Sequence, residues 1–183
     1  MKILKNNFFL GALISLVCLS ACDVVHFNRI PGTAQDTIPA EFRGEYMLAI
    51  KKKEKSNLDT LTFYVGKNSY TRIDKNEVEI KFLSDSLMFS RYGDFYFLSE
   101  KQLGMWTTNV LKLKGKDLYV FLVEVNGSSS SDKLKTLKKY FNNARVEVNG
   151  TQEIFAADMN EEKMLKYVSK NLKHKGVKLN RIE

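Results

Sequence analysis

The chain has few of the residues from which many small functional sites are built. Its 183 residues include two cysteines, two histidines, two prolines and ten glycines. The low proline and glycine content excludes a collagen-like or low-complexity chain, and two cysteines are too few for a disulfide-stapled domain. With 44% hydrophobic and 27% charged residues, the composition is instead that of one globular domain with a core of its own.

The same scarcity restricts the chemistry that the chain can perform. Of the two histidines, His26 lies in the predicted tether and His174 at a predicted helix end, where an imidazole usually contacts the terminal carbonyls, so we expect no histidine-based triad and no two-histidine metal site. The sequence contains no Gly-x-Ser-x-Gly elbow, no glycine-rich phosphate loop followed by lysine, and no calcium loop of spaced aspartates. We therefore expect a protein that is not an enzyme, with no catalytic residues, no cofactor and no metal ion.

The N-terminus has the pattern of an export signal. Lys2 and Lys5 precede an apolar stretch without charge that runs from Phe8 to Leu19. This order of a positive region and an apolar region is typical of a signal peptide. The apolar stretch is shorter than the roughly 20 residues that a membrane-spanning helix needs, so it does not predict a permanent transmembrane anchor.

Leu19-Ser20-Ala21-Cys22 ends this stretch and resembles the lipobox of bacterial lipoproteins. The resemblance implies that residues 1–21 are removed by cleavage between Ala21 and Cys22, and that the Cys22 sulfur carries a diacylglyceryl group. Two or three acyl chains of the palmitate type would make membrane attachment durable, because each buried CH₂ contributes about 0.8 kcal/mol. The resemblance places the protein in the cell envelope, and we expect the outer membrane, with the body facing the periplasm. Asp23 also resembles an inner-membrane retention signal of enteric bacteria.

Cleavage would leave a basic body. Without Lys2 and Lys5, 27 of the 29 basic residues remain against 21 acidic ones. Most bases are lysines, whereas bidentate phosphate recognition favours arginine, so we expect no nucleic-acid partner. The partners that we expect are the membrane, held through the acyl chains, and anionic lipid headgroups or envelope glycans.

The rest of the chain predicts one domain after a short linker. Residues 22–37 lack periodicity and predict a lipidated tether, and residues 38–183 predict a single globular domain. Within it, residues 38–125 are rich in strand patterns: Glu77–Phe82 and Leu111–Lys114 alternate, and Leu118–Val123 suits a buried central strand. Turn signals every 8 to 12 residues favour an antiparallel meander of about eight strands, curled into a barrel or sandwich.

Residues 132–183 predict an α/β lobe that packs on the sheet. We expect a helix capped by Ser131, a hairpin that turns at Asn149-Gly150, a second helix capped by Asn160, and a closing strand over Val177–Ile182. The fold class is therefore α+β, with a dominant antiparallel meander and a C-terminal lobe of two helices and a hairpin.

Three functions remain open. The first is a membrane-anchored envelope lipoprotein that acts as a non-catalytic binding or structural module. The second follows from Phe42-Arg43-Gly44-Glu45-Tyr46, which resembles the Gly-x-Trp opening strand of lipocalins with tyrosine in place of tryptophan; it implies a carrier of a lipophilic ligand. The third is a hydrolase of envelope glycans, which would need two facing carboxylates, with candidates among the strand glutamates Glu77, Glu79, Glu124, Glu147 and Glu153.

One further motif concerns modification. Asp36-Thr37-Ile38, Asp59-Thr60-Leu61 and Asp85-Ser86-Leu87 resemble the acceptor motif of a periplasmic O-glycosylation system, which implies glycans on Thr37, Thr60 and Ser86. An alternative reading is that Asp-Thr and Asp-Ser pairs are favoured at turns that lead into strands.

Overall fold

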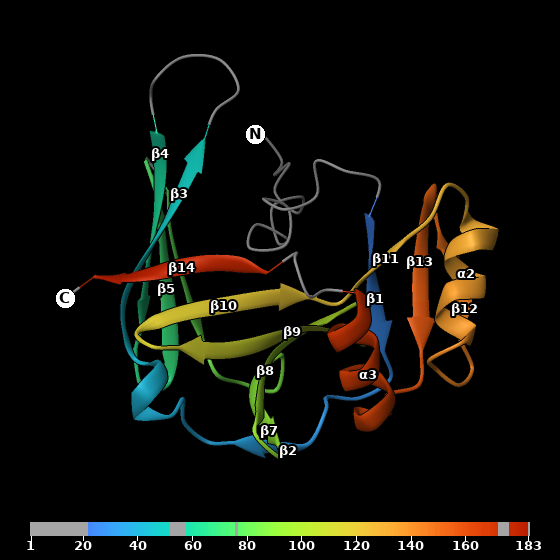
Figure 1. Cartoon of the computed structure of the whole chain (residues 1–183), viewed down its shortest axis with the longest axis horizontal. Helices are drawn as coiled ribbons and strands as arrows, with labels where there is room; N and C mark the ends of the chain where they lie inside the picture. Colours follow the sequence, from blue (N-terminus) through green and yellow to red (C-terminus); the bar gives the residue numbers. More distant parts are fainter. Residues whose placement is uncertain (1–21, 52–57, 76, 172–175, 183) are drawn as a thin grey trace, which may run out of the picture.

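A computed structural model describes residues 22–51, 58–75, 77–171 and 176–182. It shows an α+β protein dominated by antiparallel strands, as predicted (Figure 1). Among the described residues, no helix combines the length and the apolar character needed to cross a bilayer. Residues 1–21, with the predicted cleavage residue Ala21, lie outside the described residues, as does His174.

The elements follow one another in this order: β1 (Cys22–Phe27), β2 (Thr33–Gln35), the 3-10 helix η1 (Ala40–Phe42), β3 (Gly44–Lys51), β4 (Leu58–Val65), β5 (Ser69–Asp74), β6 (Glu77–Phe82), β7 (Leu87–Tyr92), β8 (Phe95–Gln102), β9 (Met105–Lys114), β10 (Asp117–Leu122), β11 (Glu124–Asn126), α2 (Ser130–Lys138), β12 (Arg145–Asn149), β13 (Gln152–Ala157), α3 (Glu161–Asn171) and β14 (Val177–Ile182).

These strands form one continuous sheet. Its main path runs β12-β13-β1-β9-β10-β14-β3-β4-β5-β6, with β8, β7 and β2 branching from β9, and β11 from β1. Each pair is antiparallel except β1 with β13. The predicted meander is present in two parts, β3–β6 and β7–β10, because β6 does not pair with β7. The sheet is curled, so that β3, β4 and β5 run across the direction of β9 and β10 (Figure 1).

Two apolar cores lie on opposite faces of this sheet. The first is covered by the helices: Leu137 of α2 and Met164 and Tyr167 of α3 are buried against Phe27 and Phe155. The second fills the inside of the curl, around residues such as Tyr46, Phe63, Phe89, Leu111 and Leu179. Alternate residues of β9 serve the two cores, since Val110 belongs to the first and Leu111 to the second. The sheet therefore acts as the partition between them.

The predicted tether is largely part of the fold. Residues 22–27 form β1, which pairs with β13, β9 and β11, and both Val25 and Phe27 are fully buried. After β1, Arg29 forms an ion pair of 2.6 Å with Glu161 in the first turn of α3, and the Gly32 N–H donates to the same carboxylate. The prediction of a tether was wrong for these residues, because their strand, hydrogen-bond and ion-pair partners lie in distant parts of the sequence.

The C-terminal elements are mostly where the sequence places them, but they do not form a separate lobe. The hairpin is present, but its two-residue turn is Gly150-Thr151, one position later than predicted, because Asn149 still pairs with Gln152. The Asn160 side chain accepts from the Lys163 N–H, as expected. The first helix is capped by Ser129 rather than Ser131, because the Ser129 hydroxyl accepts from the Asp132 N–H. The hairpin joins the sheet through β13, and β14 lies between β10 and β3. The two predicted halves thus share one sheet.

The segment that resembles the lipocalin opening strand enters β3 directly after η1. Tyr46 is fully buried, and its hydroxyl donates to the Phe42 carbonyl at 2.9 Å. The Arg181 guanidinium from β14 lies over the Tyr46 ring at 5.6 Å and donates to the Arg43 carbonyl. These contacts fix the start of the meander to β14, the last strand of the chain. The pairing of β14 between β10 and β3 adds a strand to the eight of the meander.

Candidate functional site

The sheet has an opening where β6 ends the strand order. β6 pairs with β5 on one edge, and no described strand pairs with its other edge. The next strand, β7, starts from a tight turn in which the Ser84 and Leu87 backbones exchange hydrogen bonds of 2.9 and 3.2 Å, and it then runs with β8 instead of β6. We call the gap between β6 and the β7–β8 hairpin the seam.

Charged side chains bridge the seam. We call Arg72, Glu79, Lys81 and Glu100 the seam cluster. Glu79 and Lys81 point inward from β6, opposite Arg72 and Tyr70 of β5 in the strand register. The Lys81 ammonium lies 2.7 Å from the Glu100 carboxylate of β8 and 3.4 Å from that of Glu79. An ion pair therefore connects strands that share no backbone hydrogen bonds.

The seam cluster reverses the expected faces of β6. The alternation of Glu77–Phe82 is correct, but Val78, Ile80 and Phe82 are 55–65% exposed, whereas Glu79 and Lys81 are half-buried. The inward charges are tolerated because each has an oppositely charged partner. Inward charges on an unpaired edge strand also discourage edge-to-edge aggregation.

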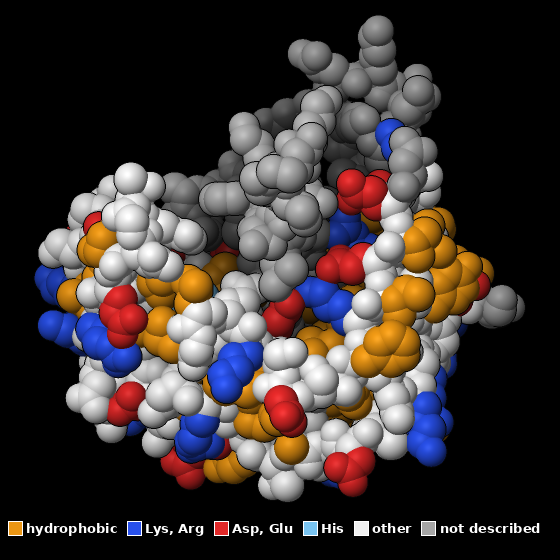
Figure 2. All heavy atoms as spheres, turned by 180° about the vertical axis from the view of Figure 1, so that it is seen from behind, with side chains coloured by type: hydrophobic (Ala, Val, Ile, Leu, Met, Phe, Trp, Pro, Cys, Tyr) orange, Lys and Arg blue, Asp and Glu red, His pale blue; other side chains and the backbone are white. Residues whose placement is uncertain are grey.

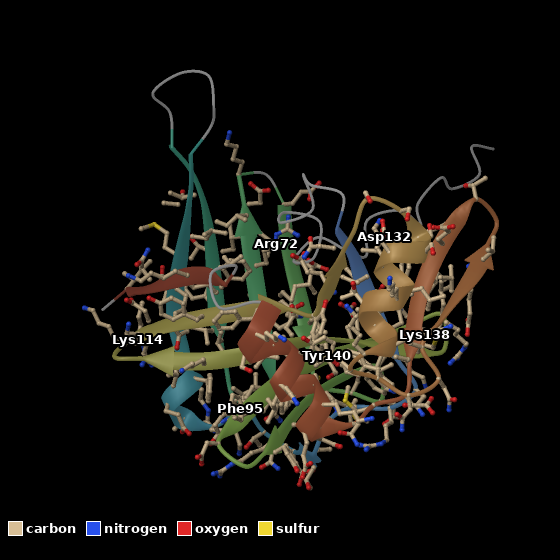
Figure 3. The ribbon with its side chains drawn as sticks, turned by 45° about the vertical axis from the view of Figure 1, so that its right-hand side comes forward. Arg72, Phe95, Lys114, Asp132, Lys138 and Tyr140 are labelled. Atoms are coloured by element: carbon tan, nitrogen blue, oxygen red, sulfur yellow. The ribbon has the colours of Figure 1, made fainter. Side chains whose placement is uncertain are left out.

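Arg72 is the most deeply buried member of the cluster. It is 7% exposed, and its guanidinium lies 3.4 Å from Glu79 and 3.6 Å from Asp74. Its Nε has no partner among the described residues. In Figure 3 Arg72 projects from β5 toward the middle of the molecule, while Lys114 and Lys138 lie at the periphery. The Nε–H of this buried guanidinium can therefore donate a hydrogen bond to a further polar partner.

Tyr70 separates the seam cluster from the apolar interior. Burial raises the pKa of its phenol well above the usual value; Glu100 and Glu79 raise it further, and Arg72 opposes them. The phenol therefore stays protonated at physiological pH. On its other side Tyr70 lines an apolar cavity of about 50 Å³ inside the curl, together with Phe42, Phe63 and Phe89.

This cavity bears on the carrier hypothesis. Its volume of about 50 Å³ is close to that of one or two water molecules, at about 30 Å³ each in the liquid. Pockets for small organic ligands usually enclose about 300 to 1,000 Å³. The interior of the curl in this conformation is therefore too tightly packed at this cavity to hold a lipophilic ligand.

A larger groove of about 300 Å³ opens at the seam. It is lined by Lys81 and Phe82 of β6, by Ser84 and Ser86 of the following turn, and by Glu100 and Lys101 of β8. Figure 2 shows acidic and basic side chains alternating down part of the rear face of the molecule. Lys81 and Phe82 reach the groove from opposite faces of β6 because the groove lies at the unpaired edge of that strand.

The seam also contains the facing carboxylates that a glycan hydrolase would need. The Glu79 and Glu100 oxygens that contact Lys81 lie 3.4 and 2.7 Å from its ammonium, hence within about 6 Å of each other. That spacing suits glycosidase carboxylates, but the Lys81 ammonium contacts both of them. Each carboxylate is therefore already engaged in an ion pair. The sequence pointed to Glu79 but not to Glu100 or Arg72, which the fold brings to it.

The residues predicted for lipidation and glycosylation lie on separate elements. Cys22 is the first residue of β1, although its side chain is outside the described part, and the next residue, Asp23, forms an ion pair of 2.5 Å with Lys133. Thr37 is half-buried in a bend, Thr60 is exposed within β4, and Ser86 is exposed in the turn at the seam groove. Of the three hydroxyls, only Ser86 follows the expected preference for a turn that leads into a strand.

His26, which we expected in the tether, is 9% exposed in β1. Burial lowers the pKa of its imidazole, and the nearby Glu147 partly opposes this shift. The imidazole is therefore neutral at physiological pH. Among the residues that the structure describes, His26 belongs to no group of three or more potential metal ligands.

No known family, no curated protein and no solved structure matches this chain.

Proposed function

We propose that this protein is a lipid-anchored protein of the bacterial cell envelope whose folded domain is a non-catalytic binding module. The observation that carries the proposal is that Cys22, the residue predicted to carry the lipid, is paired with Asn126 in the register of β1 with β11. Both cores are built from residues 25–179, so the body that remains after cleavage before Cys22 retains them. The predicted lipid attachment residue would then belong to the sheet itself.

This arrangement holds the domain close to the bilayer. Asp23, Val24 and Val25 are already paired with strand β11 or β13, and Asp23 contacts Lys133. A lipid on Cys22 would therefore be separated from the sheet by almost no flexible chain. The start of β1 lies at the same end of the molecule as the end of β3 and the start of β4 (Figure 1). That end would face the lipid headgroups of the outer membrane, with the rest of the body in the periplasm.

The non-catalytic assignment rests on the charges at the seam. A glycosidase needs two carboxylates that are free to contact the substrate, whereas Glu79 and Glu100 are each engaged in an ion pair. The two alternatives have less support: the hydrolase because Lys81 separates its candidate carboxylates, and the lipophilic carrier because the cavity inside the curl holds about 50 Å³.

Lipidation is tested by mass and by partition. The wild-type chain, expressed in a Gram-negative host, should carry acyl mass on a peptide that begins at Cys22, and should enter the detergent phase of a Triton X-114 separation. Cys22→Ala should lose both properties. Cys18→Ala is the matched control, because it removes the other cysteine and leaves the lipobox complete. Wild-type protein without acyl mass, or a Cys22→Ala protein that partitions like wild type, would contradict the proposal.

Glycosylation at Thr37, Thr60 and Ser86 is a separate proposal. Thr60 and Ser86 are exposed, which a transferase requires. In a host that has the modifying system, intact mass should show hexose-sized heterogeneity that declines stepwise in Thr37→Ala, Thr60→Ala and Ser86→Ala. Unchanged mass profiles in all three variants would remove this proposal and leave the anchoring untouched.

A further inference from the structure

The seam groove has the features of a ligand site. It is concave, holds about 300 Å³, and combines one exposed aromatic ring with a few polar groups from three elements. That volume is at the lower end of small-molecule pockets, and it suits one or two sugar rings better than an extended protein partner.

Its polar groups are held in fixed positions. The Ser84 and Ser86 hydroxyls lie 3.1 Å apart, and the Ser86 N–H donates to the Ser84 hydroxyl at 3.3 Å. The Lys101 N–H donates to the Ser86 carbonyl at 2.8 Å, which joins the turn to β8. Lys81 and Glu100, paired at 2.7 Å, place a donor and an acceptor at the groove wall. Such a set of hydroxyls, ammonium and carboxylate matches the vicinal hydroxyls of a sugar.

The charge of the groove favours an anion. Among the residues that line the groove, Lys81 and Lys101 stand against one carboxylate, Glu100, which pairs with Lys81. Glu79, which also contacts Lys81, is paired with Arg72 and does not line the groove. Lys101 is exposed and lies over the Trp106 ring at 5.6 Å, and no carboxylate among the described residues forms an ion pair with it. The groove therefore has one cation in excess, and the indole ring holds that cation in place. A carboxylate on the ligand would supply the missing charge.

Phe82 adds an apolar surface beside these groups. Its side chain, at the end of β6, belongs to neither core and is 65% exposed, which is unusual for a phenylalanine. A ring in this position offers a flat face to the apolar side of a pyranose.

We propose that the seam groove binds a carboxylate-bearing sugar of an envelope glycan, with its carboxylate on Lys101, its hydroxyls on Ser84, Ser86 and the Lys81–Glu100 pair, and its ring on Phe82. This inference rests on the proposed envelope location for the source of the ligand. It deepens the binding function by naming the ligand class and the residues that recognise it.

Two disaccharides that differ in one group test the inference. The full chain in detergent is titrated by calorimetry with N-acetylglucosaminyl-N-acetylmuramic acid and with chitobiose, which lacks the lactyl carboxylate. The acidic disaccharide should bind at least tenfold more tightly. Lys101→Gln should weaken it about tenfold, the effect of losing one charge-assisted hydrogen bond, and should leave chitobiose within about twofold. Phe82→Ala should weaken both, and Lys112→Gln, an exposed lysine of β9 outside the groove, should weaken neither.

The inference is overturned if neither disaccharide binds, if both bind equally, or if Lys101→Gln has no more effect than Lys112→Gln. Intact mass must show an unmodified Ser86, since a glycan there would fill the groove; in modified protein, Ser86→Ala restores an open groove for the titration. Binding in detergent does not depend on the acyl chains, so failure of lipidation and failure of the groove are separate results. Binding of free disaccharide without retention on purified peptidoglycan would identify a soluble sugar as the ligand source.

Discussion

The ion pair between Arg29 and Glu161 offers a direct test of whether the segment after β1 is part of the fold. Glu161 accepts from Arg29 at 2.6 and 3.0 Å and from the Gly32 N–H at 3.0 Å. The Arg29 side chain is 52% exposed, so the ion pair contributes up to about 1 kcal/mol. The part-buried Gly32 bond to a carboxylate adds about 1 kcal/mol, and a charge near the helix N-terminus about 0.5 kcal/mol. Glu161→Ala should therefore lower the free energy of unfolding by about 2 to 3 kcal/mol.

Glu162→Ala is the matched control, because it changes an exposed glutamate in the same helical turn. It should lose only the helix-dipole contribution of about 0.5 kcal/mol. Urea unfolding can be followed by the fluorescence of Trp106, the only tryptophan, which is 8% exposed in the folded protein. If the two variants unfold with equal free energies, residues 28–32 are not fastened to α3 and the tether prediction regains its support.

The same contact gives a pH dependence with a defined sign. Hydrogen bonding to Arg29 lowers the pKa of Glu161 from 4.5 to about 2, against the opposing effect of burial. A depressed carboxyl pKa stabilises the fold at all pH values above the unfolded-state value, and this contribution is lost as the pH falls through the folded-state value. The stability difference between wild type and Glu161→Ala should be constant above about pH 4.5 and should shrink toward pH 2. A difference that is the same at pH 7 and at pH 2 would show that charge is not its source.

Three further substitutions test the packing, each by urea unfolding. Gly32→Ala should lower the free energy of unfolding by more than about 3 kcal/mol, because the new Cβ would lie 2.2 Å from the Arg91 carbonyl oxygen. Gly115→Ala is the control, since Gly115 has a similar positive φ but open space around it, and it should cost about 1 kcal/mol. Leu137→Ala, at a fully buried position of α2, should cost about 3 to 4 kcal/mol, and a cost below 1 would contradict the first core. Tyr46→Phe should cost about 1 kcal/mol, since it leaves a carbonyl of η1 without its donor.

The local parts of the fold were readable from the sequence because local chemistry determines them. The period-2 pattern of Glu77–Phe82, the hairpin turn at Gly150 and the Asn160 cap each act over a few residues, and each is found within one residue of its predicted position. β1 could not be found in this way. Its apolar run is short, and its pairing with β13, β9 and β11 depends on residues at least 79 positions away in the register.

The seam cluster was missed for a related reason. Alternation placed Glu79 and Lys81 on one face of a strand, and a charged face normally points to solvent. The structure turns that face inward because Arg72 and Glu100 supply partners for it, and Glu100 comes from a strand with which β6 does not pair. Which of two faces is buried at an unpaired edge depends on tertiary partners that no local pattern contains.

The two ends of the chain complete the same sheet, and this bears on how an anchored protein of this kind would fold. β1 joins β13 to β9, and β14 joins β10 to β3, so the sheet is continuous only when the first and the last strands are both in place. Pairings of such large sequence separation form late, because their loop-closure entropy is lost before their contacts are gained. An exported chain would therefore remain unfolded until β14 has emerged. A lipid on Cys22 would then fix one end of β1 at the membrane, so the sheet would assemble around a strand whose position is already set.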